Sequence, residues 1–120
     1  MTTLLDDLRT AAAGSPELSA RVWQALTGER YICDGIGNIG RLAPNGTWYE
    51  IVPCITTDLS AACEEAERRG YFVSMSGPHN AFERPYRAQV DLSDRDMLIC
   101  DAHTMPLALC AALVAAGTKE

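Results

Sequence analysis

The sequence predicts an α/β protein of the α+β sandwich type, with a small, mostly antiparallel sheet of three to five strands packed between helices. Three observations support this fold class. Residues 105–116 are apolar on every side of a helix, two helical patterns precede the first strand-like stretch, and short segments rich in aromatic and β-branched residues alternate with turn signals. Because a helix that is apolar all round must be buried, we expect the C-terminal helix to be central to the core.

Length and composition indicate one domain over residues 1–120. The chain has 120 residues and a mass of 13.0 kDa, with 48% hydrophobic and 22% charged residues, which is ordinary globular composition. The apolar C-terminal run is shorter than the roughly 20 residues that cross a bilayer. The first residues form no basic leader. We therefore expect a cytosolic protein that has no membrane partner.

Charge and cysteine content narrow the classes of partner. The formal net charge is −6, the pI is about 4.8, and the ten basic residues are scattered, so duplex nucleic acid is not an expected partner. Five cysteines form an odd set without a C-x-x-C motif, which predicts free, mostly buried thiols.

The N-terminal third predicts two helices. Leucines and alanines recur at helical spacing behind Thr3, and Gly14 ends that run. Ser15 and Pro16 are then typical of a helix cap and first turn, and Gly28 is the expected end of the second helix.

The next segment is expected to form strands. Tyr31–Cys33 looks extended, and residues 35–40 match G-x-G-x-x-G, a motif that binds dinucleotides only where its glycines open a helix. Pro44 and the turn Asn45–Gly46 exclude a helix there, so we interpret this segment as part of a hairpin that returns through Trp48–Val52.

A third helix, three further strands and the final helix complete the expected order. Thr56, Thr57 and Asp58 offer caps for the third helix, whose inward residues are predicted to be Leu59, Ala62, Cys63 and Ala66. Its glutamates are expected to form a solvated face, with Glu64 paired to Arg68 and Glu65 to Arg69. Residues 71–75 and 87–92 predict an antiparallel pair, residues 97–100 another strand, and residues 104–117 a helix that begins at Thr104 and ends at Gly117.

Catalytic and metal chemistry finds little support in the sequence. Cys100 and His103 could supply half of a zinc site, but no second ligand pair is evident, and structural zinc needs four ligands. The support for Cys100 as a thiol nucleophile with His103 as its base is weaker than the support for a zinc site. The ordinary interpretation is that Cys100 lies on a buried strand while Asp101 and His103 help to cap the last helix. We therefore predict no catalytic residue, no metal and no cofactor.

Ligand binding by arginine and aromatic side chains is the better supported chemistry. Arginine presents a planar fork to phosphate, and aromatic rings offer faces to a base. A long connection at residues 76–85 adds further candidates. The candidate ligand-binding residues are Arg41, Trp48, His79, Arg84, Tyr86 and Arg87.

Three segments resemble the small phage and prophage proteins grouped as phage ABA sandwich domain proteins. These are residues 4–26, residues 52–62 and residues 104–112, in that order and at that spacing. The resemblance implies a helix–sheet–helix sandwich of phage origin that acts in the bacterial host cytoplasm. It implies no catalytic residue.

Two functional hypotheses follow for a non-enzymatic phage accessory protein that antagonises host defence. The first is capture of a small anionic nucleotide signal near Arg84 and Arg87. The second is an acidic protein-binding inhibitor of a host defence protein, whose Glu64, Glu65 and Glu67 dock on a basic surface; a structural accessory role without ligand is a further alternative. A homodimer or larger homo-oligomer is the alternative to a monomer, since symmetric pairs are common and a sheet edge is expected to be exposed.

Overall fold

In the part of the chain that the structure describes, four helices lie between two small antiparallel sheets. The structure, a computed structural model, describes residues 3–33, 38–42, 48–76, 86–91 and 97–119. Helices α1 (Leu4–Thr10), α2 (Pro16–Thr27), α3 (Leu59–Arg68) and α4 (Met105–Lys119) form the middle of the molecule. One sheet holds β1 (Tyr31–Cys33), β2 (Ile39–Leu42) and β3 (Trp48–Val52), and the other holds β4 (Phe72–Ser76), β5 (Tyr86–Asp91) and β6 (Met97–Ala102).

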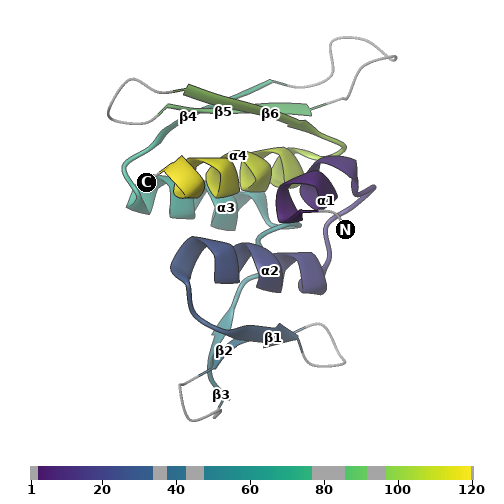
Figure 1. Ribbon diagram of the computed structural model, residues 1–120, viewed down its shortest axis with the longest axis vertical. Coiled ribbons are helices and arrows are strands. Elements are labelled where there is room, and N and C mark those ends of the chain that lie inside the picture. Colours follow the sequence, from purple (N-terminus) through teal and green to yellow (C-terminus); the bar gives the residue numbers. More distant parts are fainter. Residues whose placement is uncertain (1–2, 34–37, 43–47, 77–85, 92–96, 120) are drawn as a thin grey trace.

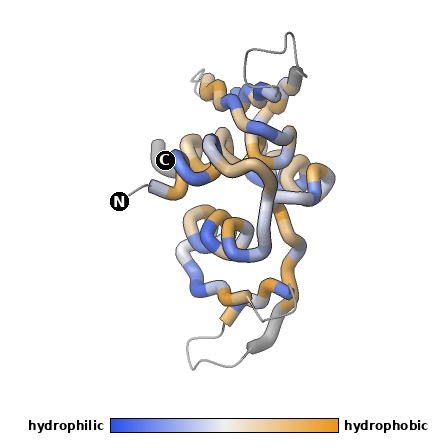
Figure 2. The backbone as a smooth tube through the Cα atoms, turned by 90° about the vertical axis from the view of Figure 1, so that its right-hand side faces the viewer, coloured by the Kyte–Doolittle hydropathy of each residue, from blue (hydrophilic) through white to orange (hydrophobic). Residues whose placement is uncertain are grey.

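The predicted α+β class and the antiparallel strands are confirmed. The arrangement differs in one respect, because six strands divide into two sheets with the helices between them (Figure 1). Along the longest axis, of 46 Å, the layers are β4–β6, then α4 with α1 and α3, then α2, then β1–β3. Figure 2 shows the same succession of layers from the side.

Helix α4 is central to the core, as predicted. Residues from Leu107 to Leu113 are fully buried, and α4 contacts all three other helices together with β5 and β6. Thr104 Oγ1 accepts a hydrogen bond from the amide of Leu107 at 3.3 Å, which confirms the expected N-terminal cap. The predicted end at Gly117 is wrong, because the helix continues to Lys119. Glycine inside a helix costs about 1 kcal/mol against alanine, which helix α4 tolerates.

The other N-terminal helix caps follow the sequence closely, whereas the predicted end of the first helix at Gly14 is wrong, because α1 ends at Thr10. Thr3 and Ser15 accept hydrogen bonds from the amides of Asp6 and Leu18, and Asp58 caps α3 through the amide of Ala61. Gly28 ends α2 with a φ of 76°, a conformation that glycine adopts without the penalty of a Cβ atom.

The second sheet presents one face to the helices and one face outward. Ala88 and Val90 on β5 and Cys100 and Ala102 on β6 are buried, whereas the alternate residues of these strands are exposed or half-buried. The alternation predicted for β5 is confirmed at Ala88 and Val90. Leu92, the third residue expected on that face, lies outside the described residues.

Ile55 and Thr56, in the middle of the link from β3 to α3, are buried, and hydroxyl groups satisfy the polar atoms of Thr56. Thr56 Oγ1 donates to the carbonyl of Ser15 and accepts from the amide of Ser15, both at 3.0 Å. Ser19 Oγ lies 2.6 Å from Thr56 Oγ1 and accepts from the amide of Thr56 at 3.0 Å. Since the Thr56 hydrogen is already donated, the Ser19 hydroxyl donates to Thr56. Both side chains are almost fully buried, so these bonds hold the link against α2.

We expect Thr56→Val to lower the free energy of unfolding by about 2–3 kcal/mol. Valine has nearly the same shape but leaves the Ser15 amide without its hydroxyl acceptor and takes from the Ser19 hydroxyl its closest partner. Urea denaturation followed by circular dichroism measures the change. The matched control is Thr57→Val at the exposed neighbouring position, for which a loss below about 1 kcal/mol is expected. Equal losses in the two variants would contradict the structural role of the Thr56 hydroxyl.

Candidate functional site

A pocket of about 260 Å³ lies where α2, α3 and the first sheet meet, and we call it the Arg41 pocket. It is the more enclosed of two notable hollows in the described part of the chain. Arginine, glutamate, tyrosine and tryptophan side chains share its wall with apolar groups. Its lining residues are Trp23, Thr27, Tyr31, Arg41, Ile51, Val52, Pro53, Ala61, Glu64, Glu65 and Arg68.

Arg41 enters the pocket from β2 because of strand register. Tyr31 on β1 pairs with Arg41, so both side chains lie on the sheet face that turns toward α2. Arg41 Nη2 donates to Glu29 Oε1 at 2.7 Å, and its Nε contacts Glu29 Oε2. About one third of the Arg41 side chain is exposed, so this ion pair remains in contact with solvent.

Aromatic side chains form one side of the pocket. The rings of Trp23 and Tyr31 are stacked, with centroids 6.2 Å apart and planes 25° from parallel. Trp23 Nε1 donates to the carbonyl of Pro53 at 2.9 Å, which ties α2 to the end of β3. Thr27 Oγ1 donates to the carbonyl of Trp23 and lies 3.4 Å from the Tyr31 hydroxyl. The aromatic pair is therefore fixed at both polar ends.

Helix α3 contributes the opposite wall, and here one prediction is wrong. Glu65 was expected on a solvated face, but it is only 4% exposed. Its carboxylate accepts from Arg69 Nε at 3.0 Å and lies 3.4 Å from Arg68 Nη1. Arg69 also donates from Nη2 to the carbonyl of Leu26 at 2.7 Å, so this ion pair joins α3 to the end of α2. The predicted pairing of Glu65 with Arg69 is confirmed, and its position on a solvated face is not.

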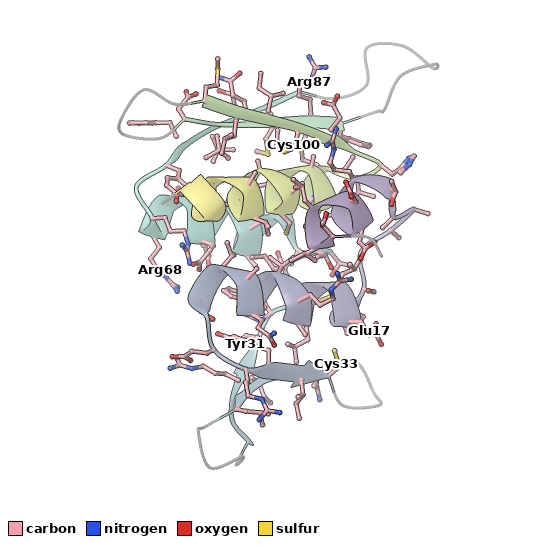
Figure 3. All side chains as sticks on the ribbon, in the orientation of Figure 1. Glu17, Tyr31, Cys33, Arg68, Arg87 and Cys100 are labelled. Atoms are coloured by element: carbon pink, nitrogen blue, oxygen red, sulfur yellow. The ribbon has the colours of Figure 1, made fainter. Side chains whose placement is uncertain are left out.

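The remaining predicted binding residues do not gather around this pocket. Tyr86 and Arg87 lie on β5, in the sheet at the other end of the molecule; Figure 3 shows Arg87 at one end and Tyr31, the strand partner of Arg41, at the other. Arg87 makes two hydrogen bonds to the Asp101 carboxylate, of 2.8 and 3.3 Å, on the outer face of the sheet.

Three of the predicted binding residues cannot be placed as side chains. Trp48 belongs to β3 and pairs with Leu42 across a register shift, but its side chain lies outside the described residues. Arg84 and His79 also lie outside them. Ligand binding by these residues stays a prediction.

The expected position of Cys100 on a buried strand is confirmed. Cys100 is buried on β6, and burial, together with the Asp101 charge, raises the pKa of its thiol despite the opposing effect of Arg9. A thiol with a raised pKa is a poor nucleophile at neutral pH. Asp101, which was expected to help cap the last helix, pairs with Arg87, and the hydroxyl of Thr104 provides a cap. Within the described residues, no group of three or more histidine, cysteine, aspartate or glutamate side chains could hold a metal ion.

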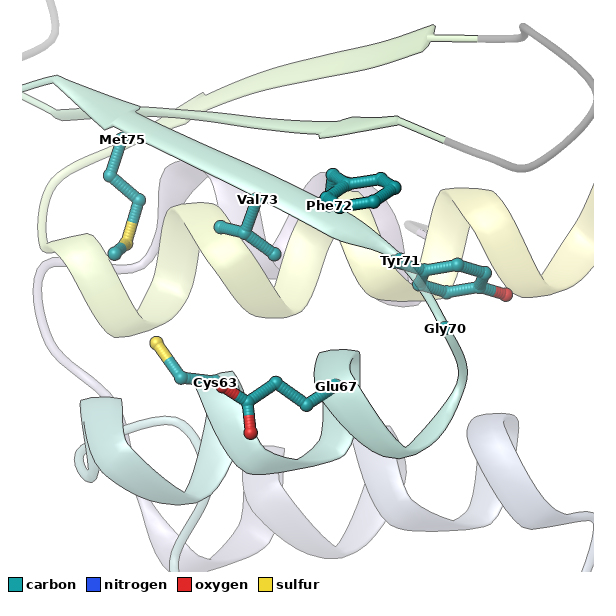
Figure 4. Close-up of a pocket in the computed structure, with 7 residues that line it drawn as sticks. All are labelled: Cys63, Glu67, Gly70, Tyr71, Phe72, Val73 and Met75. Atoms are coloured by element: carbon teal, nitrogen blue, oxygen red, sulfur yellow. The ribbon is translucent and has the colours of Figure 1, made fainter.

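A second hollow of about 500 Å³ is an open groove between α3 and β4 (Figure 4). Val73 and Met75 point from β4 toward Cys63 on α3, and Glu67 is the charged residue of the lining. Burial and the Glu67 carboxylate raise the pKa of the Cys63 thiol. Since an apolar groove with one carboxylate repels anions, it does not suit the nucleotide ligand that the sequence suggested.

Comparison with solved structures shows a likeness of fold to a phage protein. The crystal structure of a phage protein from Bacillus cereus ATCC 14579 superposes with a TM-score of 0.58 and 19% sequence identity, covering 90% of this chain and 91% of that one. At this identity the likeness is one of fold. No family model matches the sequence, and no curated protein does so either. The resemblance to the phage ABA sandwich domain proteins is therefore not confirmed.

The structure adds pocket residues that sequence reasoning did not select. Trp23, Thr27 and Tyr31 were assigned to a helix face and a strand, and Arg68 to a solvated ion pair. An available signal was the aromatic pair that flanks the Gly28 turn at the end of α2, because such a turn brings the two rings together.

Among the helices of the described residues, none has the length and apolar character that a membrane span requires.

We expect Arg69→Ala to lower the free energy of unfolding by about 3–5 kcal/mol. The substitution leaves the buried Glu65 without its closest cationic partner. It also removes the arginine that donates a hydrogen bond to the Leu26 carbonyl. Thermal and urea unfolding measure the loss. Arg68→Ala is the matched control, because 73% of the Arg68 side chain is exposed and the expected loss is below about 1 kcal/mol. Two variants of equal stability would show that Glu65 does not depend on Arg69.

Proposed function

We propose that this chain is a non-catalytic phage accessory protein that binds and sequesters a small anionic ligand of the nucleotide class in the Arg41 pocket. The observation that carries the proposal is the meeting of Arg41, Arg68 and a fixed aromatic pair in one enclosed pocket. Antagonism of a host defence signal in the bacterial cytoplasm is the biological setting we propose for this binding. The fold shared with a phage protein from Bacillus cereus supports the phage origin.

The chemistry of the pocket suits a ligand with an anionic end and an aromatic end. Guanidinium groups bind phosphate oxygens through two parallel hydrogen bonds, and Arg41 already makes such contacts with the carboxylate of Glu29. A phosphate would take the place of that carboxylate. The Trp23–Tyr31 pair offers an apolar aromatic surface to a base.

The neighbouring carboxylates set the selectivity of the pocket. Glu65 is satisfied by Arg69, whereas Glu64 is exposed at the pocket wall and can accept hydrogen bonds from amino or hydroxyl groups. With Glu29 also present, carboxylates balance the two arginines, so a ligand of low charge is favoured over a highly charged polyphosphate. The small volume of about 260 Å³ points the same way, toward a compact mononucleotide-sized ligand.

We expect Arg41→Ala to remove a bound small molecule that native mass spectrometry detects on protein purified gently from an infected host. The matched control is Arg87→Ala, which breaks a similar exposed ion pair at the other end of the molecule and should keep the adduct. If Arg87→Ala removes the adduct and Arg41→Ala keeps it, the site moves to the β5 end, where Arg84 and His79 were predicted. An adduct kept by both variants, or no adduct on the wild-type protein, contradicts the proposal.

The exchange of anions at Arg41 can be measured separately with Glu29→Gln. This substitution removes the carboxylate that competes with the ligand, so the affinity should rise by up to about fivefold, the worth of one exposed ion pair. Calorimetric titration with a panel of mono- and cyclic nucleotides, at low and high salt, gives the comparison.

A second candidate function is binding to a host protein, and one observation favours it. Phe72, Met97 and Ile99 on the outer face of β4–β6 are 78%, 55% and 50% exposed, and exposed apolar side chains on one face are typical of protein-binding surfaces. Docking of an acidic α3 surface on a basic partner has less support than the sequence suggested. Glu65 is buried, and of the three glutamates only Glu64 and Glu67 lie on the surface of α3.

We expect capture of a host protein on this face to be insensitive to salt and to be lost in Ile99→Glu, because the contact is apolar. Pull-down from host lysate at two ionic strengths, compared with the exposed control Ser60→Glu on α3, measures both effects. If binding weakens with salt and is unchanged in Ile99→Glu, the partner binds instead to the acidic surface of α3 that carries Glu64 and Glu67.

A further inference from the structure

Strand β4 is an unprotected sheet edge. Within the described residues it pairs with β5 alone, so the other side of the strand has no strand partner. Its five residues, Phe72 to Ser76, include no charged residue and no proline, and its register with β5 is regular. Natural proteins guard sheet edges with charges, prolines or bulges. None of these devices is present in β4.

The other sheet edges of the described chain are guarded or short. Strand β6 carries Asp101, the sequence of β3 includes Glu50, and β1 has only three residues. The contrast singles out β4 as the edge that is suited to accept another strand.

The inward-facing residues of the strand are apolar, and its outer face carries Phe72 beside Ser74. Phe72 is 78% exposed on the outer face, and Met75, 41% exposed, and Val73 line the mouth of the groove above Cys63 (Figure 4). A strand added beside β4 would cover these side chains, since neighbouring strands lie about 4.8 Å apart.

We propose that β4 pairs antiparallel with β4 of a second copy of this chain, around a two-fold axis at Ser74, and joins the two sheets into one of six strands. A two-fold axis perpendicular to the sheet places inward residues of one copy opposite inward residues of the other. Such an axis must lie between two copies of the same residue, and only an axis at Ser74 gives every residue of β4 a partner. Val73 then lies opposite Met75 of the second copy, above both grooves, and Ser74 lies opposite its own equivalent.

Two β4 strands can pair without bringing like charges of the strands together, because β4 contains no charged residue. The inward pairs under this symmetry are both Val73 with Met75, so apolar side chains meet at the two groove mouths, while Glu67 of each chain remains in the wall of its own groove. Each chain carries a formal net charge of −6, so copies repel over most of their surfaces. An uncharged edge is where that repulsion is smallest.

The test uses opposite charges at the proposed axis. Wild-type protein should sediment as a dimer in analytical ultracentrifugation, whereas Ser74→Lys alone and Ser74→Glu alone place like charges face to face and should weaken the dimer by about tenfold to a hundredfold. An equimolar mixture of the two variants should restore a dimer, seen as the mixed species by native mass spectrometry. Ser74 is exposed, so these variants should keep the native circular dichroism spectrum. Gln24→Lys, on an exposed position of α2, is the charge-matched control and should remain dimeric.

Two results would overturn the proposal. One is a wild-type monomer over a wide range of concentrations, which would leave the β4 edge to a strand of a different protein. The other is a dimer that forms equally well from Ser74→Lys alone, which would place the two-fold contact elsewhere.

Discussion

The burial of α4 is the constraint on which the rest of the structure depends. Its residues from Leu107 to Leu113 have no exposed surface, so helices and strands must cover it on every side. Many of the packing residues are small, such as Ala108, Ala111 and Ala112 on the helix, and Ala88 and Ala102 on the facing strands. Small side chains let the neighbours approach closely, and a core of this density needs every layer in place.

The first sheet is joined to this core through polar contacts. The link after β3 enters the interior next to α2, where Thr56 and Ser19 satisfy each other and the backbone. Cys110 on α4 lies close to the same link, with its thiol 3.4 Å from the carbonyl of Ile55. Burial raises the pKa of the Cys110 thiol, which therefore stays protonated and able to donate. A buried connection of this kind is stable because few of its hydrogen-bonding groups lack a partner.

Much of the fold could be predicted from the sequence because its signals are local. The caps at Thr3, Ser15 and Thr104 are short-range hydrogen bonds between a side chain and a nearby amide, so the residue types that form them can be recognised in the sequence. The division of six strands into two sheets depends on contacts between distant residues, which no local pattern encodes. Gly117 shows where a local signal fails. Glycine would end an isolated helix, but α4 is held by its packing and continues through Gly117.

The candidate site was less predictable for a similar reason. Arg41 was selected by its chemistry, and the structure places it in a pocket, but its neighbours Trp23 and Arg68 come from separate helices. Glu65 and Glu64 are adjacent in the sequence and each has an arginine four residues later, yet one is buried and the other exposed. The i,i+4 charge pattern is the same in both cases, and only the position of α2 against α3 distinguishes them.

The two sheets differ in how firmly the core holds them. Sheet β4–β6 packs directly on α4, whereas the helix contacts of β1–β3 are made chiefly by α2. The strands of the first sheet can therefore open locally while α2, α3, α4 and the sheet β4–β6 stay folded. Amide hydrogens of β1 and β2 would then exchange with solvent earlier than those of β5. A ligand that bridges α2, β2 and α3 would slow that exchange, and part of its binding energy would be spent on ordering this end of the chain.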